Sequence, residues 1–137
     1  HADAEQWVNE LQQQGRYDLL LVDLYDEHAH GPVCSSLDFY QGCYQSLNDR
    51  GILVVNLFGR HESFDPNVNN IRQAFDGRVV LLPEVDEGNI VVLAFKGRQL
   101  DTSIGELLEI AGQIKQRYRF PALSWVKGLL SSLGTNK

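Results

Sequence analysis

The chain has 137 residues, 43% of them hydrophobic, which is enough for a domain with its own core. Its formal net charge of −6 argues against a nucleic-acid partner, because such proteins need a basic surface to displace counterions. No apolar run is long enough to cross a bilayer and no signal peptide is visible, so we expect a cytoplasmic protein without a membrane partner.

The sequence contains no methionine, and it begins with His1-Ala2-Asp3. A native start normally leaves a methionine or a recognisable processing signal, so we expect the chain to be a piece of a longer protein. The two cysteines, Cys34 and Cys43, match no metal-binding spacing and are expected to be free thiols.

The first half of the chain alternates helical and strand patterns. A continuous apolar run that ends in Asp23 is typical of a strand buried on both faces, as in a parallel sheet covered by helices. Asp49-Arg50-Gly51 predicts a turn before a second such strand. The expected helix, strand, loop, helix and strand span 3–14, 17–23, 24–35, 36–48 and 52–57.

The second half predicts a helix, a strand pair and two more helices. Asp65-Pro66 is expected to start the helix, with Asp65 as its cap and Pro66 at the first helical position. The strands at 79–82 and 89–95 are too close in sequence for a helical crossover, so we expect them to be antiparallel. Residues 101–133 should form two helices broken at Phe120-Pro121. Tryptophans on apolar helix faces are usually core residues, which we expect of Trp7 and Trp125.

This order of elements predicts the fold class. Alternating strands and helices indicate an α/β protein, and a final antiparallel hairpin is a feature of the class I methyltransferase-like fold. We therefore expect a partial Rossmann-like sheet, mostly parallel with an antiparallel C-terminal hairpin, and helices on both faces. Residues 1–97 would form the C-terminal half of such a domain, 98–133 would be helices packing on it, and 134–137 a tail.

Several short motifs together resemble the spermidine synthase family. In that family a G-D-A/G element precedes a helix, the next strand ends in D-S-S-D-P-x-G-P, and a helix of the type S-x-x-F-Y follows. The resemblance covers residues 2–97. The matching elements here are Asp3-Ala4, Asp23-Leu24-Tyr25-Asp26, Gly31-Pro32, Leu37-Asp38-Phe39-Tyr40 and Gly51-Ile52-Leu53.

The resemblance implies roles for five residues. Asp3, with Ala4, would hold the exocyclic amine of an adenine. Asp23 would be the catalytic acid/base that takes a proton from an attacking amine, and Asp26, beside Tyr25, would bind the acceptor. Carboxylates just past the C-terminal end of a parallel strand lie where open α/β sheets bind ligands, and a protonated amine must lose a proton before it can attack.

The departures from the family pattern leave the acceptor open. Leu24 and Tyr25 replace serines, and the segment 83–89 lacks the tyrosine that helps to orient the acceptor amine in the family. His28 and His30 lie beside Asp26 and Glu27, but a stable metal site usually needs three or four fixed ligands, so we assign no metal site. Because no G-x-G-x-x-G is present, we also assign no cofactor to this chain.

Three hypotheses follow. The first is a fragment, inactive by itself, of a transferase that moves an aminopropyl group from decarboxylated S-adenosylmethionine to a small-molecule amine. The second is a fragment of an S-adenosylmethionine-dependent methyltransferase, and the third is a non-catalytic α/β module that dimerises. A homodimer is expected in any case for the chain as given, because the apolar strand residues 19–22 contain no charge, proline or bulge to protect an exposed edge.

Overall fold

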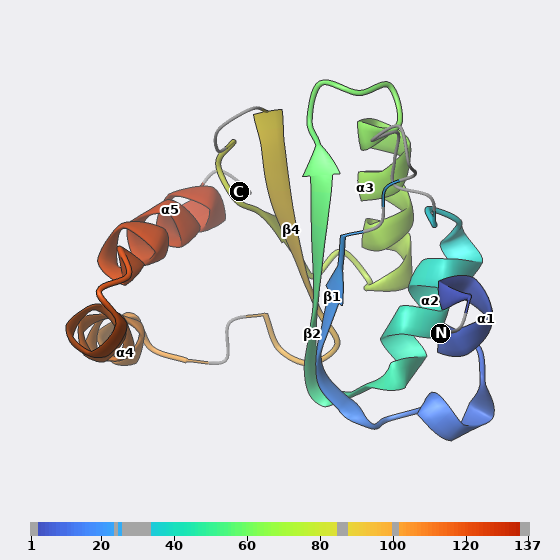
Figure 1. The fold of residues 1–137 in the computed structure, drawn as a ribbon, viewed down its shortest axis with the longest axis horizontal. Helices are drawn as coiled ribbons and strands as arrows, with labels where there is room; N and C mark the ends of the chain where they lie inside the picture. Colours follow the sequence, from blue (N-terminus) through green and yellow to red (C-terminus); the bar gives the residue numbers. More distant parts are fainter. Residues whose placement is uncertain (1–2, 24, 26–33, 85–87, 100–101, 135–137) are drawn as a thin grey trace. The chain divides into compact units, whose positions relative to one another are not determined.

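A computed structural model of the chain describes residues 3–23, 25, 34–84, 88–99 and 102–134. The chain forms two compact units, residues 1–99 and residues 100–137, and each is described by itself. The first unit is built on a sheet and the second is a pair of helices (Figure 1). The expectation that the C-terminal helices pack on the α/β domain stays a prediction.

The first unit contains a mixed four-stranded sheet with the order β1-β2-β4-β3. β1 and β2 are parallel, whereas β4 pairs antiparallel with both β2 and β3. The last strand is therefore inserted between the second strand and its own hairpin partner, which confirms the expected fold class. The strands are β1 (Tyr17–Val22), β2 (Leu47–Phe58), β3 (Val79–Leu81) and β4 (Asn89–Phe95).

The turn expected at residues 49–51 is wrong, because these residues belong to β2. The register of β1 against β2 jumps from Tyr17 opposite Leu47 to Leu19 opposite Ile52, so the sheet absorbs the extra residues as an irregularity. Gly51 is needed there, since a Cβ would lie 2.7 Å from the Cβ of Leu47 and 3.0 Å from the main-chain oxygen of Tyr17.

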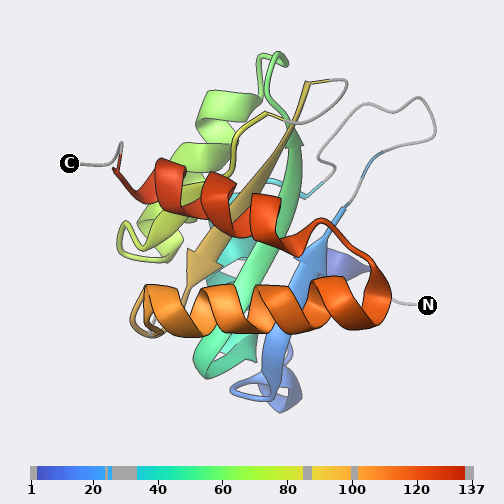
Figure 2. The same cartoon turned by 90° about the vertical axis from the view of Figure 1, so that its left-hand side faces the viewer.

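The helices of the first unit lie together on one face of the sheet (Figures 1 and 2). The helix expected at 3–14 is correct only at its start, because α1 ends at Val8 and the main-chain N–H of Asn9 closes it by donating to Gln6. Helices on the opposite face of the sheet stay a prediction. The described elements are α1 (Ala4–Val8), the 3₁₀ turn η1 (Leu11–Gln13), α2 (Leu37–Ser46) and α3 (Phe64–Ala74).

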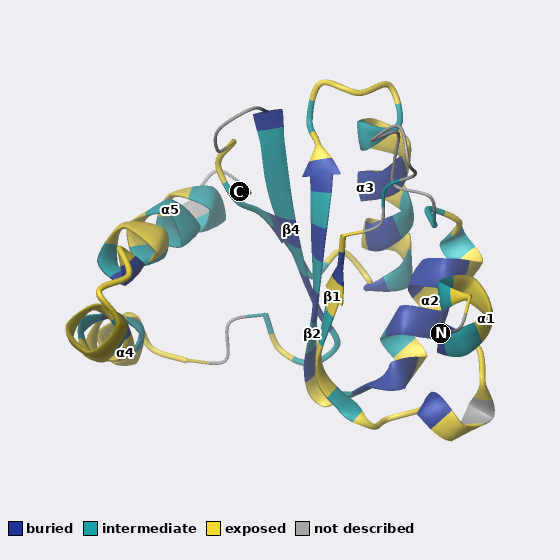
Figure 3. Cartoon of the chain, viewed as in Figure 1, coloured by how far each residue is buried: buried dark blue, intermediate teal, exposed yellow. Residues whose placement is uncertain are grey.

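The core of the first unit lies between this helical layer and the sheet (Figure 3). Val68 and Ile71 of α3, and its C-cap residue Phe75, are buried in this core. The expected cap is wrong: Ser63 holds the N-cap position of α3, which puts Asp65 inside the first turn. A carboxylate there is still favourable, because it faces the positive end of the helix dipole.

The second unit consists of α4 (Ile104–Tyr118) and α5 (Ala122–Gly134), and the break predicted at Phe120-Pro121 is confirmed. α4 starts with a capping box between Ser103 and Glu106. The core position expected for Trp125 is wrong, because this residue is 55% exposed. Its ring centroid lies 5.9 Å from that of Phe120. No helix in the described ranges is long and apolar enough to cross a membrane.

Candidate functional site

The carboxyl ends of β1 and β2 bring two polar side chains together. The parallel register pairs Val22 with Val55, so Asp23, the next residue, comes beside Asn56. The Nδ2 of Asn56 donates a hydrogen bond of 3.2 Å to the Oδ1 of Asp23. Asp23 is exposed at the edge where open α/β sheets bind ligands, which is the position that the sequence predicts for it.

Tyr25 joins this pair from the segment after β1. Its side chain is half-buried, and its hydroxyl donates a hydrogen bond of 3.2 Å to the main-chain oxygen of Asn56. Burial, and then the negative charge of Asp23, raise the pKa of Tyr25 above its ordinary value. The phenol is therefore neutral at physiological pH, and with its proton held by Asn56 its oxygen can accept a hydrogen bond from a ligand.

We call Asp23, Tyr25 and Asn56 the strand-end cluster. Sequence reasoning found the first two and missed Asn56. The signal was present, because Asn56 is the one polar residue in the apolar run 52–57. Whether Asn56 lies beside Asp23 depends on the register of β2 against β1, which cannot be deduced from this sequence alone. The cluster provides one carboxylate and one phenolic oxygen, and both can accept hydrogen bonds from an ammonium group.

Two further expectations at this end of the sheet fall on residues that the structure does not describe. Asp26, expected to bind the acceptor, lies outside the described residues, as do His28 and His30. Among the residues that are described, no group of three or more His, Cys, Asp or Glu side chains is arranged to hold a metal ion.

The predicted adenine-binding residues stand at the start of α1. Asp3 is the N-cap of this helix, and its Oδ1 accepts a hydrogen bond of 3.0 Å from the main-chain N–H of Gln6. Ala4 is the first helical residue and packs partly buried against the core. The Asp3 carboxylate therefore has a local structural role, and its exposed position leaves its second oxygen accessible.

The start of α2 returns to the start of α1. The hydroxyl of Ser36 donates a hydrogen bond of 2.7 Å to Oε1 of Glu5.

Both cysteines are free thiols, as predicted. Burial, followed by the charges of Glu5 and Asp3, raises the pKa of the Cys34 thiol, and burial raises that of Cys43 to about 12. Neither thiol is therefore an activated nucleophile.

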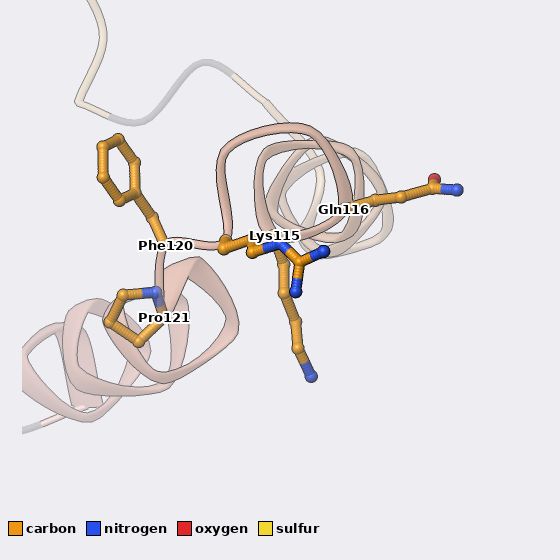
Figure 4. A pocket seen from close by; sticks show the side chains of 5 residues that line it. Lys115, Gln116, Phe120 and Pro121 are labelled. Carbon is orange, nitrogen blue, oxygen red and sulfur yellow. The ribbon is translucent and has the colours of Figure 1, made fainter.

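The second unit contains an open hollow of about 440 Å³ between the end of α4 and the start of α5 (Figure 4). Among the described residues that line it there is no carboxylate, thiol or imidazole, and none of the residues predicted to act on a substrate. Its lining offers the positive charge of Lys115 and Arg119. The hollow is lined by Lys115, Gln116, Arg119, Phe120 and Pro121.

No family model matches the chain, but comparison with known proteins finds several with similar sequences. A polyamine aminopropyltransferase of Chromobacterium violaceum is 27% identical over 105 residues, which is 77% of this chain and 40% of that protein. One from Neisseria meningitidis serogroup A is 26% identical over 119 residues, 87% of this chain and 45% of its own length. A third, from Clostridioides difficile, is 42% identical over 60 residues, 42% of this chain and 20% of that protein.

Two solved structures share the fold. A spermidine synthase in complex with the transition-state analogue AdoDATO superimposes with a TM-score of 0.60 and 22% identity, over 77% of this chain and 39% of that one. Spermidine synthase from Thermotoga maritima gives a TM-score of 0.54 and 18% identity, over 77% of this chain and 36% of that one. This chain thus spans less than half the length of these relatives.

The mixed sheet, with an acid at the end of its parallel pair, defines the class of fold: a Rossmann-like α/β fold of the methyltransferase type. Within that class the chain is spermidine synthase-like. Its sequence is similar to polyamine aminopropyltransferases, and its fold is similar to that of spermidine synthase.

Proposed function

We propose that this chain forms the acceptor-activating part of an aminopropyltransferase that uses decarboxylated S-adenosylmethionine and a small amine. The observation that carries the proposal is the strand-end cluster, in which the Asp23 carboxylate is held by Asn56 at the edge where open α/β sheets bind ligands. The names of the curated relatives support the same reaction class. A cytoplasmic location is part of this proposal.

In the proposed step, Asp23 accepts one proton from the ammonium group of the acceptor. The freed nitrogen lone pair then forms a C–N bond to the methylene carbon next to the donor sulfonium. The C–S bond breaks with its electron pair moving to sulfur, which becomes a neutral thioether, and the positive charge passes to the new amine. The chemistry of the chain's own residues is therefore proton transfer and positioning.

The other predicted site residues divide between acceptor and donor. Tyr25 would accept a hydrogen bond from the acceptor nitrogen, because its own proton is directed to the Asn56 carbonyl. Asp26 would bind the acceptor's second cationic group. Asp3 and Ala4 would contact the adenine of the donor, with Asp3 accepting from the exocyclic amine through the oxygen that does not cap α1.

The test is a transfer assay on a protein that carries these residues together with the part of the relatives' length that this chain does not span. The protein is supplied with a diamine and either decarboxylated S-adenosylmethionine or S-adenosylmethionine, and the products are identified by mass spectrometry. An added aminopropyl group supports the proposal. An added methyl group would favour the methyltransferase alternative, and no transfer from either donor, together with a stable dimer, would favour the non-catalytic module.

A polypeptide of these 137 residues alone should bind neither donor appreciably, because it contains no glycine-rich phosphate or nucleoside loop. It should also self-associate, since β1 pairs only with β2 among the described strands and Leu19 and Leu21 are 51% and 71% exposed. Titration calorimetry and light scattering check the two statements. Micromolar donor binding, or a clean monomer at high concentration, would contradict them.

A further inference from the structure

Asn56 stands at the centre of the strand-end cluster, and nothing in the resemblance to the spermidine synthase family assigns it a role. Its side-chain amide donates to Asp23, and its main-chain oxygen accepts from Tyr25. A single residue of β2 thereby contacts both groups that the proposed function places around the acceptor amine. Asn56 also lies inside a regular strand, so its main chain is fixed by pairing with β4.

We infer that Asn56 is a positioning residue that orients the Asp23 carboxylate and the Tyr25 hydroxyl toward the acceptor amine. This inference rests on the proposed function. An exposed carboxylate after the end of a strand can rotate about χ1 and χ2, and the Asn56 amide selects the rotamer in which Oδ1 faces β2. The second oxygen, Oδ2, then faces away from this bond and can take the proton. Orientation of this kind affects the rate more than the binding.

The chain offers a matched control at the other end of the same two strands. There the Nδ2 of Asn48, in β2, donates to the Oδ1 of Asp18, in β1. The pair is chemically the same, but it lies at the N-terminal edge of the parallel pair, away from the edge where ligands bind. The Oδ1 of Asn48 also accepts a hydrogen bond of 3.0 Å from the main-chain N–H of Arg50, so it has a local structural role.

The kinetic experiment uses the protein of the transfer assay and compares Asn56→Leu with Asn48→Leu. Asn56→Leu removes the donor but keeps the main-chain oxygen for Tyr25. It should lower kcat by about 10–100-fold and change the KM for the amine little, as expected when a reacting group is misplaced. Asn48→Leu should leave kcat unchanged and lower the melting temperature.

The pH dependence separates positioning from a general structural defect. As the pH approaches the ordinary pKa of a primary amine, about 10.4, more of the acceptor is already neutral and depends less on Asp23. The kcat defect of Asn56→Leu should therefore shrink between pH 7.5 and pH 10. A defect caused by distorted structure would keep the same factor across this range.

Asn56→Asp keeps the shape of the side chain and serves if Asn56→Leu fails to fold. It replaces the donor with a second carboxylate and should lower kcat at least as much.

A second readout does not depend on activity. In a ¹⁵N NMR spectrum of the 137-residue chain, the side-chain amide resonances of Asn56 should shift in the Asp23→Asn variant and remain unchanged in the Asp18→Asn variant.

The outcomes distinguish the inference from the function on which it rests. If Asp23→Asn abolishes transfer and a folded Asn56 variant retains full kcat, the positioning role is wrong and the function stands. If Asp23→Asn itself retains full activity, the proposed function is wrong. An unchanged Asn56 amide signal in the Asp23→Asn chain would overturn the positioning role whatever the assay gives.

Discussion

The two ends of the β1–β2 pair carry the same two residue types and differ in what surrounds them. At the N-terminal end, Asn48 contacts Asp18 and also accepts from the main chain of Arg50, within an irregular part of the sheet. At the C-terminal end, Asn56 contacts Asp23 in a regular register, and Tyr25 completes the group. An Asp–Asn pair is therefore not a site by itself. Its position relative to the strand direction decides whether it stabilises the sheet or faces a ligand.

Packing at the two ends supports the same distinction. At the N-terminal end, the Cβ position of Gly51 is filled by Leu47, which is fully buried, and by a main-chain oxygen. At the C-terminal end, a Cβ at Gly59 would lie 2.5 Å from the Cδ1 and 3.0 Å from the Cγ1 of Ile90, and 3.4 Å from the main-chain oxygen of Gly88. The first end is closed by rigid groups, whereas the second is bordered by a side chain that can move.

The largest effect that we predict contrasts the two aspartates. In the protein of the transfer assay, Asp23→Asn should reduce kcat by about 10²–10⁴-fold, the range typical of losing a general base. Asp18→Asn, the matched change at the other end of β1, should leave kcat within twofold of the wild type, because its carboxylate lies away from the edge where open α/β sheets bind ligands. Steady-state kinetics checks both variants, and equal losses would remove the distinction between the two ends.

The next effect concerns the two glycines. Gly51→Ala should lower the free energy of unfolding by about 1–3 kcal/mol, because the added methyl group overpacks a site with no room to relax. Gly59→Ala should cost less, about 0.5–1 kcal/mol, since Ile90 can turn a side-chain torsion away from the new methyl group. Denaturant unfolding measures both variants. The reverse order would show that the C-terminal end is the more rigidly packed of the two.

The smallest effect is a change in the pKa of Tyr25. Burial raises this pKa first and the charge of Asp23 raises it further, so Asp23→Asn should move it back toward its ordinary value, while Asp18→Asn should not. A raised pKa means that the folded state holds the proton longer than the unfolded state. The associated stability is therefore complete below the ordinary tyrosine pKa and is lost as the pH rises past it.

Ultraviolet absorbance of the phenolate, referenced to a Tyr25→Phe chain, follows this titration. The reference is needed because the chain has five tyrosines. The same midpoint for Tyr25 in wild type and Asp23→Asn would mean that the two side chains do not interact through charge.

The parts of the fold that the sequence predicts are those set by local patterns. The apolar run before Asp23 identifies β1, the short gap before Asn89 predicts the antiparallel hairpin, and Pro121 predicts the break between α4 and α5. Each of these depends on neighbours in the chain, so a single sequence is sufficient.

The errors occur where pairing across the sheet or tertiary packing decides. Asp49-Arg50-Gly51 has the composition of a turn, but it belongs to β2, where the register against β1 shifts between Leu47 and Ile52. Trp125 lies on an apolar face of its helix and is nevertheless exposed. Asn56 was missed for the same reason, because only the register Val22 opposite Val55 brings it beside Asp23.

The central claim is that the carboxyl end of β1, and not its other end, receives the acceptor amine. A crystal structure of the protein of the transfer assay with a bound diamine tests it most directly. We predict one nitrogen of the diamine within about 2.6–3.2 Å of the Asp23 carboxylate and within hydrogen-bond reach of the Tyr25 hydroxyl. A diamine bound elsewhere, with Asp23 and Tyr25 both free of it, would contradict the account.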